Sequence, residues 1–264
     1  SVAIDGRSQT MRSDSGELAL PILPGEHGIE IQWRQTGEMG FRTSTPGVDI
    51  GAPSSNIELS LTKPRDRWLL ATRGPALGPA VLYWSELAVL ILFAFILGRI
   101  GLAPLSSWHW LLLGLGFSTF SWPVLGVVVL WLLACGARER WQTEVNWWRF
   151  NLIQTGIGGL TIVALLSIVT ALPQGLLGTP DMHVAGYKSY GDLVSWFADS
   201  SASALPIATV LSVPLWIYKV LILAWALWLS FALLRWLPWV WRCFSSHGYW
   251  RSRKGEALRP GSEG

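Results

Sequence analysis

The chain has 264 residues, of which 51% are hydrophobic and only 14% are charged. A soluble domain carries about 25% charged residues, so this composition excludes a surface that faces water throughout. The formal net charge of +3 gives no indication of a nucleic-acid partner. Two isolated cysteines, Cys135 and Cys243, form no metal motif. We therefore expect lipid to replace water over much of the molecule, and we predict no cofactor.

Residues 1–75 are expected to form a β-rich, sandwich-like segment outside the membrane. Apolar and polar residues alternate over 29–34 and 57–62, which is typical of strands with one buried face. A third strand is predicted over 17–23, and the turn-rich link 24–28 joins it to the next. Because so few strands make a small core, we expect this segment to be the end of a larger domain.

Four long apolar runs follow, over about 77–97, 108–134, 152–172 and 206–235. Each is near or above the roughly 20 residues that an α-helix needs to cross a hydrocarbon core about 30 Å thick. Of the 18 tryptophans, many lie near the run ends, as in the aromatic belts at membrane surfaces. We therefore predict a mainly α membrane protein, with a bundle of about four transmembrane helices within 76–241. The basic tail, 242–264, is expected to be disordered.

Prolines and small residues predict the shape of individual helices. Pro123 in the second run and Pro214 in the fourth are expected to kink their helices, and Pro173 is expected to end the third. Small residues allow helix backbones to approach closely. The start of the third run therefore predicts a helix-packing face, made by Thr155, Gly156, Gly158 and Gly159.

The link 173–205 is the longest between runs. Its apolar residues Leu193, Val194, Trp196 and Phe197 have helical spacing, which predicts a short helix lying in the membrane interface. The link also holds four candidate site residues, namely Asp181, His183, Asp192 and Asp199. An Asp-x-His pair can ligate a metal, but no third ligand stands at a fixed spacing, so we predict no metal site. A solvated loop docked on the bundle explains the same residues.

Two charged residues fall inside the predicted spans. Lys219 lies about midway along the fourth run, and Glu86 is the acidic residue in the first run. A charge inside a membrane is costly, so these residues are expected to face other helices or a wet cavity, and to be partners. They indicate either an ion or proton relay or a structural salt bridge. No nucleophile elbow, zinc-protease or nucleotide-binding motif occurs, so no catalytic residue is predicted.

The placement of lysine and arginine predicts the threading, because cytoplasmic flanks carry the excess of positive charge. With four crossings, the charges favour both termini in the cytoplasm and the link 173–205 outside. The alternative places the N-terminal domain in the periplasm. It requires either a re-entrant run or a fifth crossing if the basic tail is to stay in the cytoplasm.

Several segments resemble the C-terminal membrane region of large bacterial envelope proteins. They are DRW at 66–68, GPAVLYW at 78–84, WHWLLLG at 108–114, GLLGTPDM at 175–182 and LAWALW at 223–228. The resemblance covers nearly the whole chain and implies a long β-rich region upstream and a place in the inner membrane. It implies no activity and no catalytic residue.

Three classes of function remain. The first is an inner-membrane anchor and interaction protein that holds a β-rich domain at the bilayer, with lipid, other envelope proteins or further copies of itself as partners. The alternative is a transporter or channel component that uses Lys219 and Glu86. A lesser alternative is an intramembrane or lipid-modifying enzyme that uses the link from Asp181 to Asp199. The anchor is favoured because four spans with so few polar residues offer little for a solute pathway.

Overall fold

The computed structural model describes residues 1–9, 16–21, 24–35, 37, 39–140, 146–246 and 248–251. The chain divides into two compact units, an N-terminal unit over Ser1–Met39 and a main unit over Gly40–Gly264. The tail predicted to be disordered lies outside the described residues from residue 252 onward.

The N-terminal unit is a small antiparallel sheet in which β1 (Val2–Ile4) pairs with β2 (Arg7–Gln9) on one side and β3 (Ile29–Ile31) on the other. The strand predicted over 29–34 is thus confirmed in its first half. The strand predicted over 17–23 is wrong for residues 18–21, which form no strand, and residues 22 and 23 lie outside the described residues. The turn after β1 is held by Asp5, whose carboxylate accepts hydrogen bonds from the Gly28 N–H at 2.9 Å and from Nδ1 of His27 at 2.8 Å.

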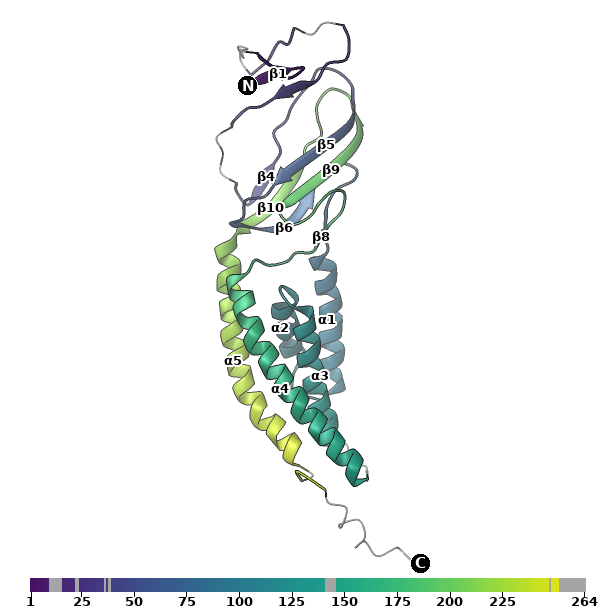
Figure 1. The fold of residues 1–264 in the computed structure, drawn as a ribbon, viewed down its shortest axis with the longest axis vertical. Helices are drawn as coiled ribbons and strands as arrows, with labels where there is room; N and C mark the ends of the chain where they lie inside the picture. Colours follow the sequence, from purple (N-terminus) through teal and green to yellow (C-terminus); the bar gives the residue numbers. More distant parts are fainter. Residues whose placement is uncertain are drawn as a thin grey trace, which may run out of the picture. The chain divides into compact units, whose positions relative to one another are not determined.

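The main unit contains two small antiparallel sheets that share one core (Figure 1). One sheet has the strand order β4 (Arg42–Ser44), β10 (Thr209–Pro214), β6 (Arg67–Arg73), and the other pairs β5 (Ser54–Thr62) with β9 (Leu193–Ser201). A short ladder joins β7 (Ala80–Val81) to β8 (Val184–Ala185). The core between the sheets contains Leu69, Trp196 and Val210. We call this assembly the sandwich.

The sandwich confirms one predicted strand and corrects two other predictions. Residues 57–62 lie in β5, and the buried Ile57 lies on its inner face. The interfacial helix predicted around Leu193–Phe197 is wrong, because these residues form β9 and pair with β5 along its length. Residues 206–214, assigned to the fourth apolar run, include β10. Val210 and Ser212 of this strand, and Ala208 just before it, are buried in alternation. That alternation has the two-residue period of a strand.

The described residues of the main unit form five helices: α1 (Tyr83–Ile100), α2 (Ser107–Ser118), α3 (Trp122–Arg140), α4 (Trp147–Leu177) and α5 (Leu215–Ser245). By length and composition, α1, α3, α4 and α5 are able to cross a membrane. The second apolar run is therefore two helices. Pro123 is the second residue of α3, where its missing N–H leaves no bond unmade, so it starts a helix and does not kink one.

The other prolines also differ from prediction. Pro214 precedes α5 with an extended backbone, so it does not kink that helix either. Pro173 lies inside α4, which continues to Leu177, and therefore does not end the third run. The small-residue face predicted on α4 meets another helix only at Gly158, among the described residues, where an added Cβ atom would lie 3.9 Å from the Phe244 ring of α5. Gly156 and Gly159 are exposed, and a Cβ atom added to either would meet open space.

Neighbouring helices run in opposite directions. Gly98 near the end of α1 packs against Ser107 at the start of α2, and Gly136 near the end of α3 packs against the backbone of Leu102. Further along, Trp131 of α3 donates a hydrogen bond to Thr161 of α4 at 3.0 Å. Successive helices thus alternate, and α1, α3 and α5 all lead away from the sandwich (Figure 1).

This order corrects one element of the predicted threading. With four crossings, residues before the first run and the link after the third were expected on opposite sides of the bundle. The pairing of β5 with β9 and of β6 with β10 shows that both segments lie at the same end. The short α2 supplies the additional pass that makes this possible.

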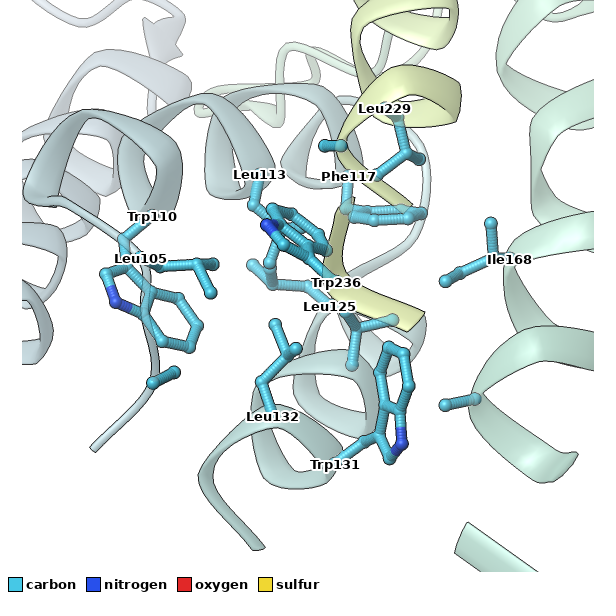
Figure 2. Close-up of a cluster of buried hydrophobic side chains, with 14 of the residues drawn as sticks. Leu105, Trp110, Leu113, Phe117, Leu125, Trp131, Leu132, Ile168, Leu229 and Trp236 are labelled. Carbon is cyan, nitrogen blue, oxygen red and sulfur yellow. The ribbon is translucent and has the colours of Figure 1, made fainter. Parts of the chain in front are cut away.

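The bundle core is apolar and closely packed (Figure 2). Leu113 and Phe117 of α2, Trp131 of α3 and Leu229 of α5 are completely buried in it. The outward faces are apolar too: exposed side chains include Leu92, Phe93, Leu152, Ile162, Val163, Leu166, Val169, Leu221, Phe231 and Leu234. A bundle that is apolar on the outside as well as the inside is typical of helices surrounded by lipid.

Candidate functional site

A cavity of about 670 Å³ lies where the sandwich meets the helices. Its walls come from the turn between β5 and β6, from the link that follows α4, and from the first residues of α5. Charged side chains of both signs line it, namely Lys63, Arg67, Asp181 and Asp192, together with the imidazole of His183. This combination of polar groups in a concave site makes it the candidate functional site.

His183 is held from both sides by carboxylates. Its Nδ1 lies 2.8 Å from Oε2 of Glu86, in the first turn of α1, and its Nε2 lies 3.5 Å from Oδ2 of Asp181. The backbone of His183 has a φ of 46°, and its N–H donates to Oδ1 of Asp181 at 2.8 Å. A left-handed backbone is unfavourable for histidine, so the surrounding contacts must fix it. The imidazole therefore joins the link after α4 to the start of α1.

A second ion pair closes another wall of the cavity. Nζ of Lys63 lies 2.8 Å from Oδ1 of Asp192, and the Lys63 N–H donates to the Asp192 carbonyl at 2.8 Å. The lysine side chain is only 13% exposed, so its charge is largely removed from water and depends on this partner. Outside the cavity, Lys188 pairs with Glu58 of β5. Hydrogen bonding to Glu58, then to Tyr187, raises the pKa of Lys188.

Polar groups on the helix side support the floor of the cavity. Oη of Tyr218 in α5 donates to the Gly175 carbonyl of α4 at 3.3 Å and lies 3.5 Å from Oγ1 of Thr119. The Asp181 N–H donates to the Thr119 carbonyl at 3.1 Å, which ties the link to the turn between α2 and α3. The Trp68 ring packs edge-on against Tyr218, with the ring centres 5.5 Å apart.

The structure brings together three of the four residues predicted in the link. Asp181, His183 and Asp192 line the cavity, whereas Asp199 is exposed on β9 and does not line it. The predicted partnership of Glu86 with Lys219 is wrong, because the carboxylate of Glu86 binds His183. Lys219 is exposed, and it is the fifth residue of α5 and not the middle of a span.

Sequence reasoning missed three residues that line the cavity, Lys63, Arg67 and Trp68, and also Tyr218, which packs against Trp68. Lys63 and Arg67 counted only among the lysines and arginines used to predict the threading, and Arg67 also lies in the DRW segment of the resemblance. The turn Pro64-Arg65-Asp66 between two alternating segments was the available sign that they flank a hairpin-like corner. Nothing in the sequence indicates that Tyr218 faces that corner, because the contact depends on the direction of α5.

The arrangement is suited to binding and to holding elements together. Within the described residues, no group of three histidine, cysteine, aspartate or glutamate side chains is placed to hold a metal ion. Lys63 and His183 each have a carboxylate partner already.

Fold and site together define a bundle of apolar helices that is joined to a β-sandwich, with the ion pairs around the cavity at the junction. Comparisons with protein-family models, with curated proteins and with solved structures found no match.

Proposed function

We propose that this protein is an inner-membrane anchor and interaction protein of the bacterial envelope, which holds its sandwich rigidly at the bilayer surface. In this proposal α1, α3, α4 and α5 cross the membrane, and the short α2 makes an additional pass within the bundle. The sandwich then presents its surface to partners outside the cytoplasm.

The observation that carries the proposal is how the sandwich is built. β5 and β6 precede the helices, whereas their partners β9 and β10 come from between α4 and α5. No linker separates β10 from α5, because one ends at Pro214 and the other begins at Leu215. Nε1 of Trp84 in α1 donates to the Leu70 carbonyl of β6 at 2.7 Å, which fixes a second helix to the sheet. Such joints hold a domain at a fixed orientation.

The distribution of charge supports a sandwich on the outer face. Arg99, Arg138, Arg140, Arg149 and Arg242 all lie at or near the helix ends away from the sandwich. The short turn between α2 and α3, at the sandwich end, has no positive residue. Short loops dominate the positive-inside rule, so this pattern favours a cytoplasmic far end. The additional pass of α2 removes the conflict between an external sandwich and a cytoplasmic tail.

Four hydroxyl groups within the helices donate locally, which argues against a solute pathway. The hydroxyls of Thr155, Thr161, Thr170 and Ser230 each donate to a carbonyl one turn earlier in their own helix, at 2.8 to 2.9 Å. Glu86 is bonded to His183 and Lys219 is exposed near a helix start. Neither residue lies in a buried polar path through the core.

The sandwich offers apolar side chains for partner contact. Phe41 is 62% exposed, Ile50 is 53% exposed and Ile207 is 54% exposed. Exposed aromatic and aliphatic side chains of this size are typical anchor residues in protein interfaces.

The test is affinity purification of the tagged full-length chain from its host membranes in mild detergent. We expect a stoichiometric partner that is lost from Phe41→Ser and Ile50→Ser variants and kept by Lys219→Met, the control. Reconstitution of the pure protein into liposomes gives the opposing test. Ion or solute flux that Glu86→Gln or Lys219→Met abolishes would establish a transporter and refute the anchor.

A further inference from the structure

A charged side chain is buried at the end of the bundle away from the sandwich. Arg138, in the last turn of α3, is only 6% exposed, and its Nη2 has no hydrogen-bond partner. Its Nε reaches Oε1 of Gln154 at 3.5 Å, a weak bond. Within the described part of the chain, Arg138 has no ion pair. A buried guanidinium without a counter-charge is strongly unfavourable, so this position calls for an anion.

The surroundings of Arg138 add further positive charge. The guanidinium carbon of Arg138 lies 4.7 Å from the centre of the Phe150 ring, and that of Arg251 lies 4.4 Å from the same centre. Asn151 fixes Arg251 in place by donating to its carbonyl and accepting from its N–H, both at 3.0 Å. Glu139, the nearest acid in sequence, is directed to α5, where it accepts from Nε1 of Trp239 at 3.0 Å.

The start of α4 adds to the positive potential around Arg138 and Arg251. Asn146 makes no side-chain cap, and the first turn contains no acidic residue. The unpaired N–H groups there are equivalent to roughly half a positive charge. A helix start with these properties binds anions, and here two arginines lie beside it.

We propose that Arg138, Arg251 and the first turn of α4 form a site for the phosphate of an anionic phospholipid. The planar guanidinium can bind phosphate with two parallel hydrogen bonds, and rotation away from Gln154 sacrifices only the weak 3.5 Å contact. Exposed Trp148, Trp241 and Trp250 surround this end of the bundle, as expected at headgroup depth. The inference rests on the proposed membrane crossing, which brings headgroups to this level.

The test is native mass spectrometry of the delipidated full-length protein in detergent. Phosphatidylglycerol, phosphatidylcholine and inorganic phosphate are titrated separately. We expect one tightly retained phosphatidylglycerol and much weaker phosphatidylcholine. Arg138→Gln should weaken retention by about tenfold or more, which corresponds to the loss of a charged hydrogen bond. Arg242→Gln is the matched control, because it removes an exposed charge at the same end of the bundle.

Several outcomes would overturn the site. Equal weakening by Arg138→Gln and Arg242→Gln would mean diffuse electrostatic attraction. Displacement of lipid by inorganic phosphate would assign the site to the free anion. If Arg138→Gln does not fold, Arg251→Gln tests the same prediction, and unchanged retention there also refutes it. Carbonate extraction of membranes from cells that express wild type separates this failure from failure of the membrane proposal.

Discussion

The carboxylate of Glu86 lies 2.8 Å from the imidazole of His183, although the two residues are 97 positions apart in the chain. Glu86 lies in the first turn of α1, and His183 follows α4. Their contact, together with the ladder between β7 and β8, joins the entrance of the bundle to the link that completes the sandwich. Glu86 therefore connects two parts of the fold and does not form the predicted pair with Lys219.

Replacing Glu86 with glutamine should lower the free energy of unfolding by about 1 kcal/mol, because both partners are partly exposed and the pair is only partly desolvated. His183→Gln should cost a similar amount. Unfolding of the detergent-solubilised protein measures both, and the double variant should cost less than the sum. Asp199→Asn, an exposed carboxylate on β9, serves as the control and should have no effect. Strict additivity would show that the two side chains do not interact.

Gly136→Ala should destabilise the bundle by about 1 to 3 kcal/mol, because its new methyl group would collide with the carbonyl of Leu102. That neighbour is backbone and cannot rotate away. The measurement is the thermal unfolding temperature in detergent.

Gly156→Ala is the matched control for Gly136→Ala. It lies in a helix with open space where the methyl group would go, so helix propensity should raise stability by up to about 1 kcal/mol. A loss of stability at Gly156 would instead indicate that this face of α4 packs against another molecule.

The additional pass of α2 predicts which residues are accessible from outside the cell. In a variant without the two native cysteines, Lys188→Cys should react with a membrane-impermeant thiol reagent in intact cells. Pro104→Cys, between α1 and α2, and Ser246→Cys, after α5, should react only after permeabilisation. Labelling of Pro104→Cys in intact cells would contradict the threading, since four simple crossings place that loop opposite the tail.

The N-terminal unit should respond to acid through Asp5. Hydrogen bonds from His27 and from the Gly28 N–H lower the pKa of the Asp5 carboxyl below 3.8. A lowered pKa stabilises the folded state above the ordinary value, and this contribution disappears as pH falls through the lowered one.

Amide hydrogen exchange of Gly28, followed from about pH 6 to about pH 3, measures the Asp5 contribution. Protection should decrease at the acid end in the wild type. Asp5→Asn should start with less protection and lose the pH-dependent part. The same pH profile in both proteins would show that another group is responsible.

The sequence predicted an element correctly where its residues showed only one pattern, either a long apolar stretch or a strict alternation. The apolar stretches around α1 and α4 predicted helices near their observed positions, and the alternation in β5 predicted its buried Ile57. The cavity residues in the link were found because charged side chains are conspicuous in an apolar chain.

The failures have two physical causes. An unbroken apolar run does not reveal a turn, so the second run concealed the break at Thr119–Ser121, where the chain reverses between α2 and α3. In addition, a buried strand and a helix have similar composition. Residues 206–213 were therefore added to α5, and this placed Lys219 in the middle of a span. β9 and β10 pair with strands that come much earlier in the sequence. This pairing depends on tertiary contacts, which a short stretch of sequence cannot reveal.

The direct passage from β10 into α5 also imposes an order on assembly. β5 and β6 are synthesised first, yet the strands that pair with them arrive only after α1, α2, α3 and α4. Until then their edges remain open and their apolar faces uncovered. The sandwich is thus completed last, because β9 and β10 can pair with β5 and β6 only after the chain has passed through the four preceding helices.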